Sequence, residues 1–230
     1  AVLTALEIMN EGYDWIVDID LEKFFDTVNH DKLMTIFGRT IKDGDVISVV
    51  RKFLVSGIMI DNEYEESVIG TPQGGNISPL LANIMLNELD KEMEQRGLNF
   101  VRYADDCIIM VKSEMAANRL MRSISKFIEE KLGLKVNITK SKVDKPKGIK
   151  YLGFGFYYDS FAEQYKAKPH TKSIAKFKAR IKELTCRSWG VSNEYKVQKI
   201  NQLIRGWINY FKIGSMKNFC KLMDAHIRYR

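Results

Sequence analysis

The clearest alternation of apolar and polar positions lies in residues 14–21. The odd-numbered positions from Trp15 to Leu21 are apolar, and Asp18 and Asp20 lie between them. Successive side chains of a β-strand point to opposite faces. The pattern therefore predicts a strand that buries one face and presents two carboxylates on the other.

Two short apolar runs flank the tetrapeptide YADD at residues 103–106. The first run ends at residues 100–102, and the second covers residues 107–111. Strand-like runs separated by a polar pair are typical of a β-hairpin. We expect a hairpin over about residues 99–112, with Asp105 and Asp106 at its tip.

Several other segments repeat apolar residues every three or four positions, which is typical of amphipathic helices. Ser78 is a good N-cap for one of them, with Pro79 in the first helical position and Gly97 at its end, and Gly133 is expected to end another. The predicted helices cover about residues 30–38, 44–56, 78–96 and 114–132. The other predicted elements are a hairpin at 57–69, a strand at 134–138, a basic loop at 140–150 and a strand or hairpin at 151–157.

From about residue 170 onward the pattern is helical throughout. Three apolar stripes alternate with basic faces, so three amphipathic helices can pack as a small bundle with a positive outer surface. The order of elements predicts an α+β fold, in which an antiparallel sheet with helices on one face precedes the three helices. We place the domain boundary near residues 159–170, which gives domains over 1–160 and 161–230.

Charge is divided unevenly between these parts. Residues 160–230 hold 16 Lys+Arg and 4 Asp+Glu, a net charge of +12, whereas residues 1–159 hold 20 and 25, a net charge of −5. A basic segment after an acidic one suggests that the basic helices bind a polyanion. The ordinary alternative is a solvated basic face.

Composition excludes several classes of protein. No apolar run approaches the length needed to span a bilayer, and no signal-peptide pattern opens the chain. Three cysteines and three histidines show no metal-binding spacing, which predicts no zinc site and suits a reducing compartment. The chain begins at Ala1 inside a predicted helix, so we expect a fragment or a processed form.

The carboxylates at residues 18, 20, 105 and 106 are the strongest candidates for chemistry. Adjacent acids at the ends of apolar strands are costly to bury unless a cation neutralises them. A pair of Mg²⁺ ions would do so, and two-metal sites catalyse phosphoryl and nucleotidyl transfer. A solvated turn and an exposed strand face are the ordinary alternatives.

Five motifs, taken together, resemble those of bacterial group II intron-encoded reverse transcriptases, which are also maturases. In chain order they are DIDLEKFFD at 18–26, TPQGGNISPLLANI at 71–84, YADD at 103–106, YLGF at 151–154 and RGWINYF at 205–211. The resemblance covers nearly the whole chain and implies a polymerase palm, with the remaining part of the fingers, over 1–160. Residues 161–230 would form the helical thumb, or maturase-specific domain.

The resemblance implies the metal ligands. Asp20 and Asp105 would hold both Mg²⁺ ions, Asp106 would support the site, and the backbone carbonyl of Leu21 would help one ion. Asp18 has no ligand counterpart in the family, so we set it aside despite its position.

The resemblance also implies the residues that bind the nucleotide and the primer. Phe25 would exclude a 2′-hydroxyl, Gln73 and Gly74 would contact the incoming dNTP, and Lys140 or Lys142 would protonate pyrophosphate, with Lys140 preferred. The ordinary alternatives are core packing for Phe25, an ordinary loop for Gln73 and Gly74, and a solvated basic loop for the lysines. The primer grip would be formed by Tyr151, Leu152, Gly153 and Phe154. RNA would be bound by Lys172, Lys176, Arg180, Lys199 and Arg205.

The implied function is RNA-directed DNA polymerisation, together with binding of the parent intron RNA to assist splicing and mobility. The implied partners are intron RNA, an RNA template with its DNA primer, and dNTPs. The expected location is a bacterial cytoplasmic ribonucleoprotein, and no membrane partner is expected. The sequence does not decide whether the protein forms a homodimer. Most of the fingers region falls before Ala1, which leaves open the activity of these 230 residues alone. Two alternatives remain: a related reverse transcriptase of a CRISPR or phage-defence system, and an RNA-binding splicing chaperone with an inactive palm.

Overall fold

The computed structural model describes residues 1–230 except 61–62, 66–68, 72–74, 187 and 230. The chain forms two compact units. The first comprises Ala1 and residues 13–144, and the second comprises residues 2–12 and 145–230. The boundary predicted near residues 159–170 falls inside the second unit, and the division into palm and thumb stays a prediction.

The first unit is built on a four-stranded antiparallel sheet in the order β4-β5-β1-β6. Its strands are β1 (Trp15–Ile19), β4 (Asn99–Tyr103), β5 (Asp106–Val111) and β6 (Lys142–Asp144). The predicted strand at 14–21 and the hairpin at 99–112 are thus confirmed. β1 lies between β5 and β6, with Asp18 opposite Ile108 on one side and Lys142 on the other.

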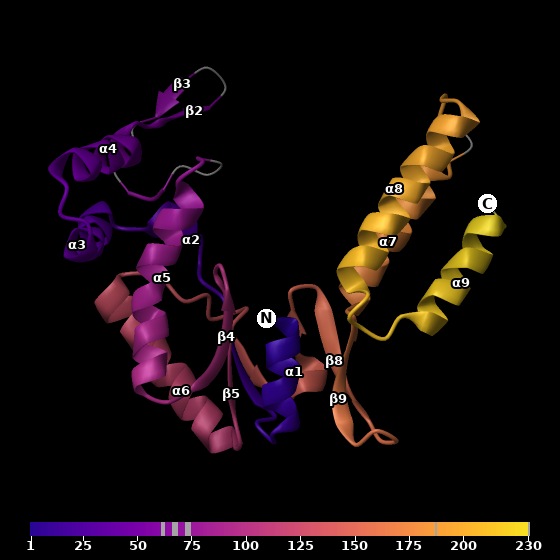
Figure 1. The fold of residues 1–230 in the computed structure, drawn as a ribbon, viewed down its shortest axis with the longest axis horizontal. Helices are drawn as coiled ribbons and strands as arrows, with labels where there is room; N and C mark the ends of the chain where they lie inside the picture. Colours follow the sequence, from indigo (N-terminus) through magenta and orange to yellow (C-terminus); the bar gives the residue numbers. More distant parts are fainter. Residues whose placement is uncertain (61–62, 66–68, 72–74, 187, 230) are drawn as a thin grey trace. The chain divides into compact units, whose positions relative to one another are not determined.

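Helices cover one face of this sheet. The helical elements of the unit are α2 (Phe24–Thr27), α3 (His30–Thr40), α4 (Gly44–Val55), α5 (Ser78–Gln95) and α6 (Glu114–Phe127), which continues as one π-helical turn, η1 (Ile128–Leu132). Figure 1 shows α5 and α6 against the same side of β4 and β5. Val17, Ile19 and Ile109 join the apolar core under these helices, which leaves Asp18 and Asp20 on the other face. A small hairpin, β2 (Ile58–Ile60) and β3 (Glu63–Glu65), completes the unit.

The second unit combines a three-stranded antiparallel sheet with helices. Its elements are α1 (Val2–Asn10), a 3₁₀ turn η2 (Pro146–Gly148), β7 (Lys150–Tyr151), β8 (Phe154–Asp159), β9 (Gln164–Pro169), α7 (Thr171–Leu184), α8 (Asn193–Phe211) and α9 (Lys217–Arg228). α1 covers the edge strand β9, where the Asn10 side chain accepts a hydrogen bond from the Tyr165 amide at 2.6 Å. Phe177, Ile181 and Met223 form the apolar cluster shared by α7, α8 and α9. The three predicted helices are therefore confirmed.

Three local predictions were wrong. Residues 134–138 do not form a strand, because only Val136 pairs, in a single bridge to Leu21. The basic loop at 140–150 contains β6 and the start of β7, since pairing with β1 overrides its weak strand composition. Ser78 is buried as the first helical residue and Ile77 occupies the N-cap, so the serine does not cap α5.

Candidate active site

The carboxylates of two neighbouring strands share the sheet face opposite the helices. The register pairs Asp18 with Ile108 and Ile19 with Cys107, and Asp20 and Asp106 are the residues that follow and precede this last pair. Directly opposite side chains in an antiparallel pair lie on the same face. The fold thus brings together Asp20 and Asp106, which are far apart in the sequence.

Asp20 is held by three hydrogen bonds to its backbone, whereas Oδ2 of its side chain accepts none. Its amide donates to Ser141 Oγ at 3.0 Å, the Ser141 hydroxyl donates to its carbonyl at 3.3 Å, and the Asn137 amide donates to the same carbonyl at 2.8 Å. Asp20 Oδ2 is buried without a hydrogen-bond partner, and Lys140 Nζ lies 3.6 Å from it. A buried carboxylate oxygen in this state is costly unless a cation or a donor reaches it.

Charge accumulates around Asp18 on the same face. The pKa of Asp18 is raised to about 6, mainly by burial and also by the charges of Asp106 and Asp20, while the nearby Lys142 ammonium lowers it. Lys142 Nζ also lies 3.7 Å from Asp144 Oδ2. Asp18, Asp20 and Asp106 therefore interact electrostatically as one acidic group.

The hairpin tip presents its acids from a conformation that L-residues rarely adopt. Ala104 has φ 54°, Asp105 follows it in the turn, and Asp106 is the first residue of β5. Asp105 and Asp106 are both exposed. A left-handed backbone conformation raises the conformational energy of an alanine, and residues in such conformations are common at functional sites.

The acidic residues offer oxygen ligands of the kind that Mg²⁺ binds. Within the described parts of the chain, no three His, Cys, Asp or Glu side chains are grouped so that they could hold a metal ion. Asp20 Oδ2, which accepts no hydrogen bond, and Asp106 at the start of β5 nevertheless supply hard oxygen donors. The bridge between Leu21 and Val136 is formed by two hydrogen bonds, from the Asn137 amide to the Asp20 carbonyl and from the Glu22 amide to the Lys135 carbonyl. These two bonds do not use the Leu21 carbonyl. Mg²⁺ completes its shell with water and phosphate oxygens, so this donor set fits it.

Phe25 lies half-buried on α2, beside the buried Phe24, with ring centroids 5.3 Å apart. The Thr71 amide donates to the Phe25 carbonyl at 2.6 Å. Gly70 has φ 92°, and a Cβ there would lie 2.8 Å from the same carbonyl, so glycine allows this close approach. The segment that leads to Gln73 and Gly74 is thereby fixed against Phe25, whereas Gln73 and Gly74 themselves lie outside the described residues.

The predicted primer grip is a tight turn between β7 and β8. Leu152 has φ 48° and Gly153 has φ 79°, as two-residue hairpin loops require. Tyr210 Oη on α8 donates to the Leu152 carbonyl at 3.0 Å, and Ser173 Oγ on α7 donates to the Gly153 carbonyl at 2.8 Å. Tyr151 and Phe154 flank the turn and are buried. Helices α7 and α8 thus both brace the turn.

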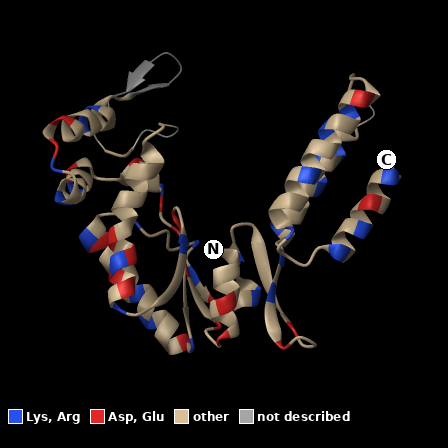
Figure 2. Cartoon of the chain, viewed as in Figure 1, with Lys and Arg blue, Asp and Glu red and all other residues tan. Residues whose placement is uncertain are grey.

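The predicted RNA-binding cations lie on α7 and α8. Lys172, Lys176, Arg180 and Arg205 are exposed, and Lys199 is half-buried with its ammonium 5.2 Å from the Tyr195 ring centroid. Figure 2 shows lysine and arginine along α7, α8 and α9.

Three residues with structural roles at the site escaped the sequence analysis. Ser141 contacts Asp20 across 121 positions, Tyr210 contacts Leu152 across 58, and Arg102 contacts Asp90 and Asn83 on α5. Contacts between residues this far apart leave no periodic pattern in the sequence. Arg102 does lie immediately before the YADD motif, and Tyr210 lies within the RGWINYF motif. None of the helices in the described part of the chain has the length and apolar character needed to cross a membrane.

Comparisons with known proteins find two matching families. The family described as reverse transcriptase (RNA-dependent DNA polymerase) matches residues 5–156, and the group II intron, maturase-specific domain matches residues 174–230. The group II intron-encoded protein LtrA of Lactococcus lactis is 39% identical over 97 residues, which are 42% of this chain and 16% of LtrA. The retron Ec86 reverse transcriptase of Escherichia coli is 25% identical over 217 residues, 92% of this chain and 59% of that protein.

A solved structure of telomerase from Candida tropicalis, in complex with a fragment of telomeric RNA, has a TM-score of 0.54 at 13% identity. The match covers 91% of this chain and 41% of that one, and it shows the fold alone. The chain spans less than two thirds of the length of each of these relatives. The α+β polymerase fold predicted from the sequence is confirmed.

Proposed function

Because the chain belongs to the reverse transcriptase family and carries a group II intron maturase-specific domain, we propose that it is an RNA-directed DNA polymerase of the group II intron maturase type. It adds dNTPs to a primer 3′-hydroxyl on an RNA template. The observation that carries this proposal is the gathering of Asp18, Asp20 and Asp106, where the charges of Asp106 and Asp20 both raise the pKa of Asp18 and Asp20 Oδ2 is buried without a hydrogen-bond partner.

Asp20, Asp105, Asp106 and the Leu21 carbonyl would hold two Mg²⁺ ions on the acidic face. When bound, such ions would supply activation of the primer hydroxyl and neutralisation of the triphosphate charge. The protein's own contribution is to fix the donors before substrate arrives, and the three hydrogen bonds to the Asp20 backbone support this role.

The remaining site residues orient the nucleotide and handle the leaving group. Phe25 packs under the deoxyribose and excludes a 2′-hydroxyl by its bulk, while Gln73 and Gly74 contact the nucleotide. Lys140 donates a proton to pyrophosphate, and its 3.6 Å approach to Asp20 favours it over Lys142, whose ammonium lies beside Asp144.

The second unit positions the nucleic acid. The turn at residues 151–154 supports the primer end, and Lys172, Lys176, Arg180, Lys199 and Arg205 contact RNA phosphates. The same basic helices bind the parent intron RNA and assist its splicing, in a bacterial cytoplasmic ribonucleoprotein. The maturase-specific match favours this role over a defence-system reverse transcriptase.

Primer extension on an RNA template, with Asp20→Asn compared against Asp18→Asn in the intact protein, tests the proposal. Asp20→Asn should lower dNTP addition by about 1,000-fold or more, because the charge stabilisation that a metal supplies is worth several kcal/mol. Asp18→Asn, two positions away on the same face, should keep most of the activity and serves as the matched control. Undiminished synthesis by Asp20→Asn would refute the assignment.

A further inference from the structure

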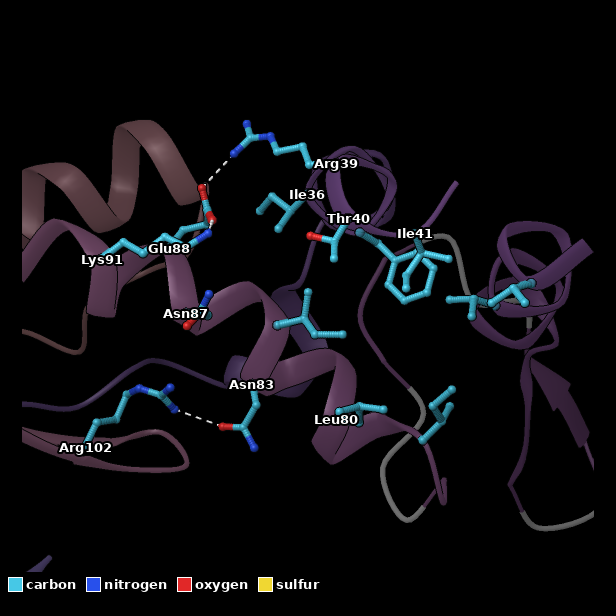
Figure 3. Close-up of a pocket in the computed structure, with 15 residues that line it drawn as sticks. Ile36, Arg39, Thr40, Ile41, Leu80, Asn83, Asn87, Glu88, Lys91 and Arg102 are labelled. Atoms are coloured by element: carbon cyan, nitrogen blue, oxygen red, sulfur yellow. Dashed lines mark hydrogen bonds and ion pairs between the residues drawn. The ribbon is translucent and has the colours of Figure 1, made fainter. Parts of the chain in front are cut away.

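Arg102 on β4 lies on the helix side of the sheet, immediately before YADD, and its side chain is only 12% exposed. Its Nε donates to Asp90 Oδ1 at 2.7 Å, and its Nη2 donates to Asp90 Oδ2. Its Nη1 donates to Asn83 Oδ1 at 2.9 Å and to the Ala104 carbonyl at 2.8 Å. Figure 3 shows the bond from Arg102 to Asn83 on α5.

This one guanidinium therefore joins two elements. Asp90 and Asn83 both belong to α5, a helix whose Leu81, Met85 and Leu89 are fully buried in the core. Ala104 is the turn residue with φ 54°. The guanidinium ties the carbonyl of the strained residue to a rigid helix, and rigid support of this kind sets the position of the next two residues.

We propose that Arg102 is a positioning residue for the polymerase reaction. It holds the YADD turn against α5, so that Asp105 and Asp106 are presented to the acidic face in a fixed place. The inference rests on the proposed function, but Arg102 itself touches neither substrate nor metal. The simpler alternative is that Arg102 and Asp90 form an ion pair that stabilises the fold alone.

Charge alone cannot reproduce this arrangement. An arginine presents donors in a planar fork and can bond Asp90, Asn83 and Ala104 at once, whereas a lysine offers a single ammonium on a flexible stem. Arg102→Lys therefore keeps the charge opposite Asp90 and loses the fork. The substitution separates the two interpretations.

The test uses Arg102→Lys in the intact protein, with Arg39→Lys as the matched control. Arg39 Nη1 lies 2.7 Å from Glu88 on the same helix, and Figure 3 shows this ion pair apart from the bond between Arg102 and Asn83. Arg102→Lys should lower kcat by roughly 10- to 100-fold, with KM for dNTP within about twofold, because misplaced groups lose transition-state stabilisation. Arg39→Lys should leave both parameters unchanged.

Hydrogen–deuterium exchange without metal or substrate gives a second, independent readout. Amides of residues 103–107 should exchange roughly tenfold faster in Arg102→Lys, while those of α5 and α6 keep the wild-type rate. Exchange and kcat that both match wild type would overturn the inference, as would faster exchange spread over the whole unit. Loss of activity in Asp20→Asn alongside a normal Arg102→Lys would reject the inference and leave the proposed function standing.

If Arg102→Lys does not fold, Asn83→Ala is a second variant that tests the same inference. Asn83 is exposed and supplies one acceptor to the guanidinium, so its loss is tolerated. A smaller loss of kcat and faster exchange at residues 103–107 would support the inference, and wild-type values would overturn it.

Discussion

At the scale of single residues, Asp20 has an arrangement that lowers the stability of the fold and suits the binding of a cation. Its backbone is bonded to Ser141 and Asn137, yet Oδ2 is buried with Lys140 only at 3.6 Å. A buried carboxylate oxygen normally accepts a hydrogen bond in addition to facing a cation. The arrangement is expected of a carboxylate that is kept ready for a cation.

Phe25 provides a test of sugar selection. Phe25→Ala should raise the kcat/KM for ribonucleotides relative to deoxynucleotides by roughly 10- to 100-fold, because the side chain that would clash with a 2′-hydroxyl is removed. The measurement is single-nucleotide primer extension with matched dNTP and rNTP.

Phe24→Leu is the control for this substitution. Phe24 is buried, 4% exposed, so replacing it with another large apolar residue should lower stability by about 1 kcal/mol and leave sugar selection unchanged. If Phe25→Ala discriminates as well as wild type, Phe25 is a core residue and not the gate.

At the scale of elements, β1 and α8 organise the two units. β1 places its acids between β5 and β6, and the residues before β6 hold the Asp20 backbone. α8 carries the segment RGWINYF, in which Trp207 and Phe211 pack inside the unit and Tyr210 reaches the turn at Leu152. This segment is therefore at least partly structural.

Tyr210→Phe tests the connection between α8 and the predicted primer grip. The substitution removes the hydroxyl bonded to the Leu152 carbonyl and keeps the ring, whose centroid lies 5.7 Å from that of Phe154. KM for the primer–template should rise about 2- to 10-fold, because one hydrogen bond is worth roughly 0.5–1.5 kcal/mol. Steady-state extension at varied primer–template concentration measures it.

Tyr195→Phe on the same helix is the matched control, since the Tyr195 ring contacts Trp189 and Lys199 and not the turn. An unchanged KM in Tyr210→Phe would mean that the turn does not depend on this bond.

At the scale of the whole molecule, the main feature that bears on RNA binding is the uneven distribution of charge along the chain. Residues 160–230 carry a net charge of +12 and residues 1–159 carry −5. A strongly basic helical surface binds a polyanion mainly by releasing its counterions. RNA affinity should therefore fall steeply as salt rises.

The triple substitution of Lys172, Lys176 and Arg180 by Gln should reduce the slope of log K against log salt by about 2, because each lost phosphate contact contributes about 0.7. Filter binding of intron RNA at several salt concentrations measures the slope. Replacing Arg119, Arg122 and Lys126 on α6 removes the same number of exposed cations and should leave the slope unchanged. Equal effects of both triples would place RNA elsewhere than on α7.

Local patterns were sufficient for much of this protein. Alternation predicted β1 and the YADD hairpin, helical periodicity predicted α5 and α6, and the motifs predicted the family. These features depend on neighbours within a few positions, where the periods of strand and helix leave a direct trace. The metal-ligand, nucleotide and primer assignments stay predictions.

Only the tertiary structure decided the contacts that hold the site together. It placed β6 beside β1, left residues 134–138 with one bridge, and brought Ser141 to Asp20, Arg102 to Asn83 and Tyr210 to Leu152. Each of these contacts joins groups that lie in different elements, and the free energy that selects it comes from burial and hydrogen bonding in the assembled core. No local pattern carries that information, because the partner of a side chain is set by how the elements pack.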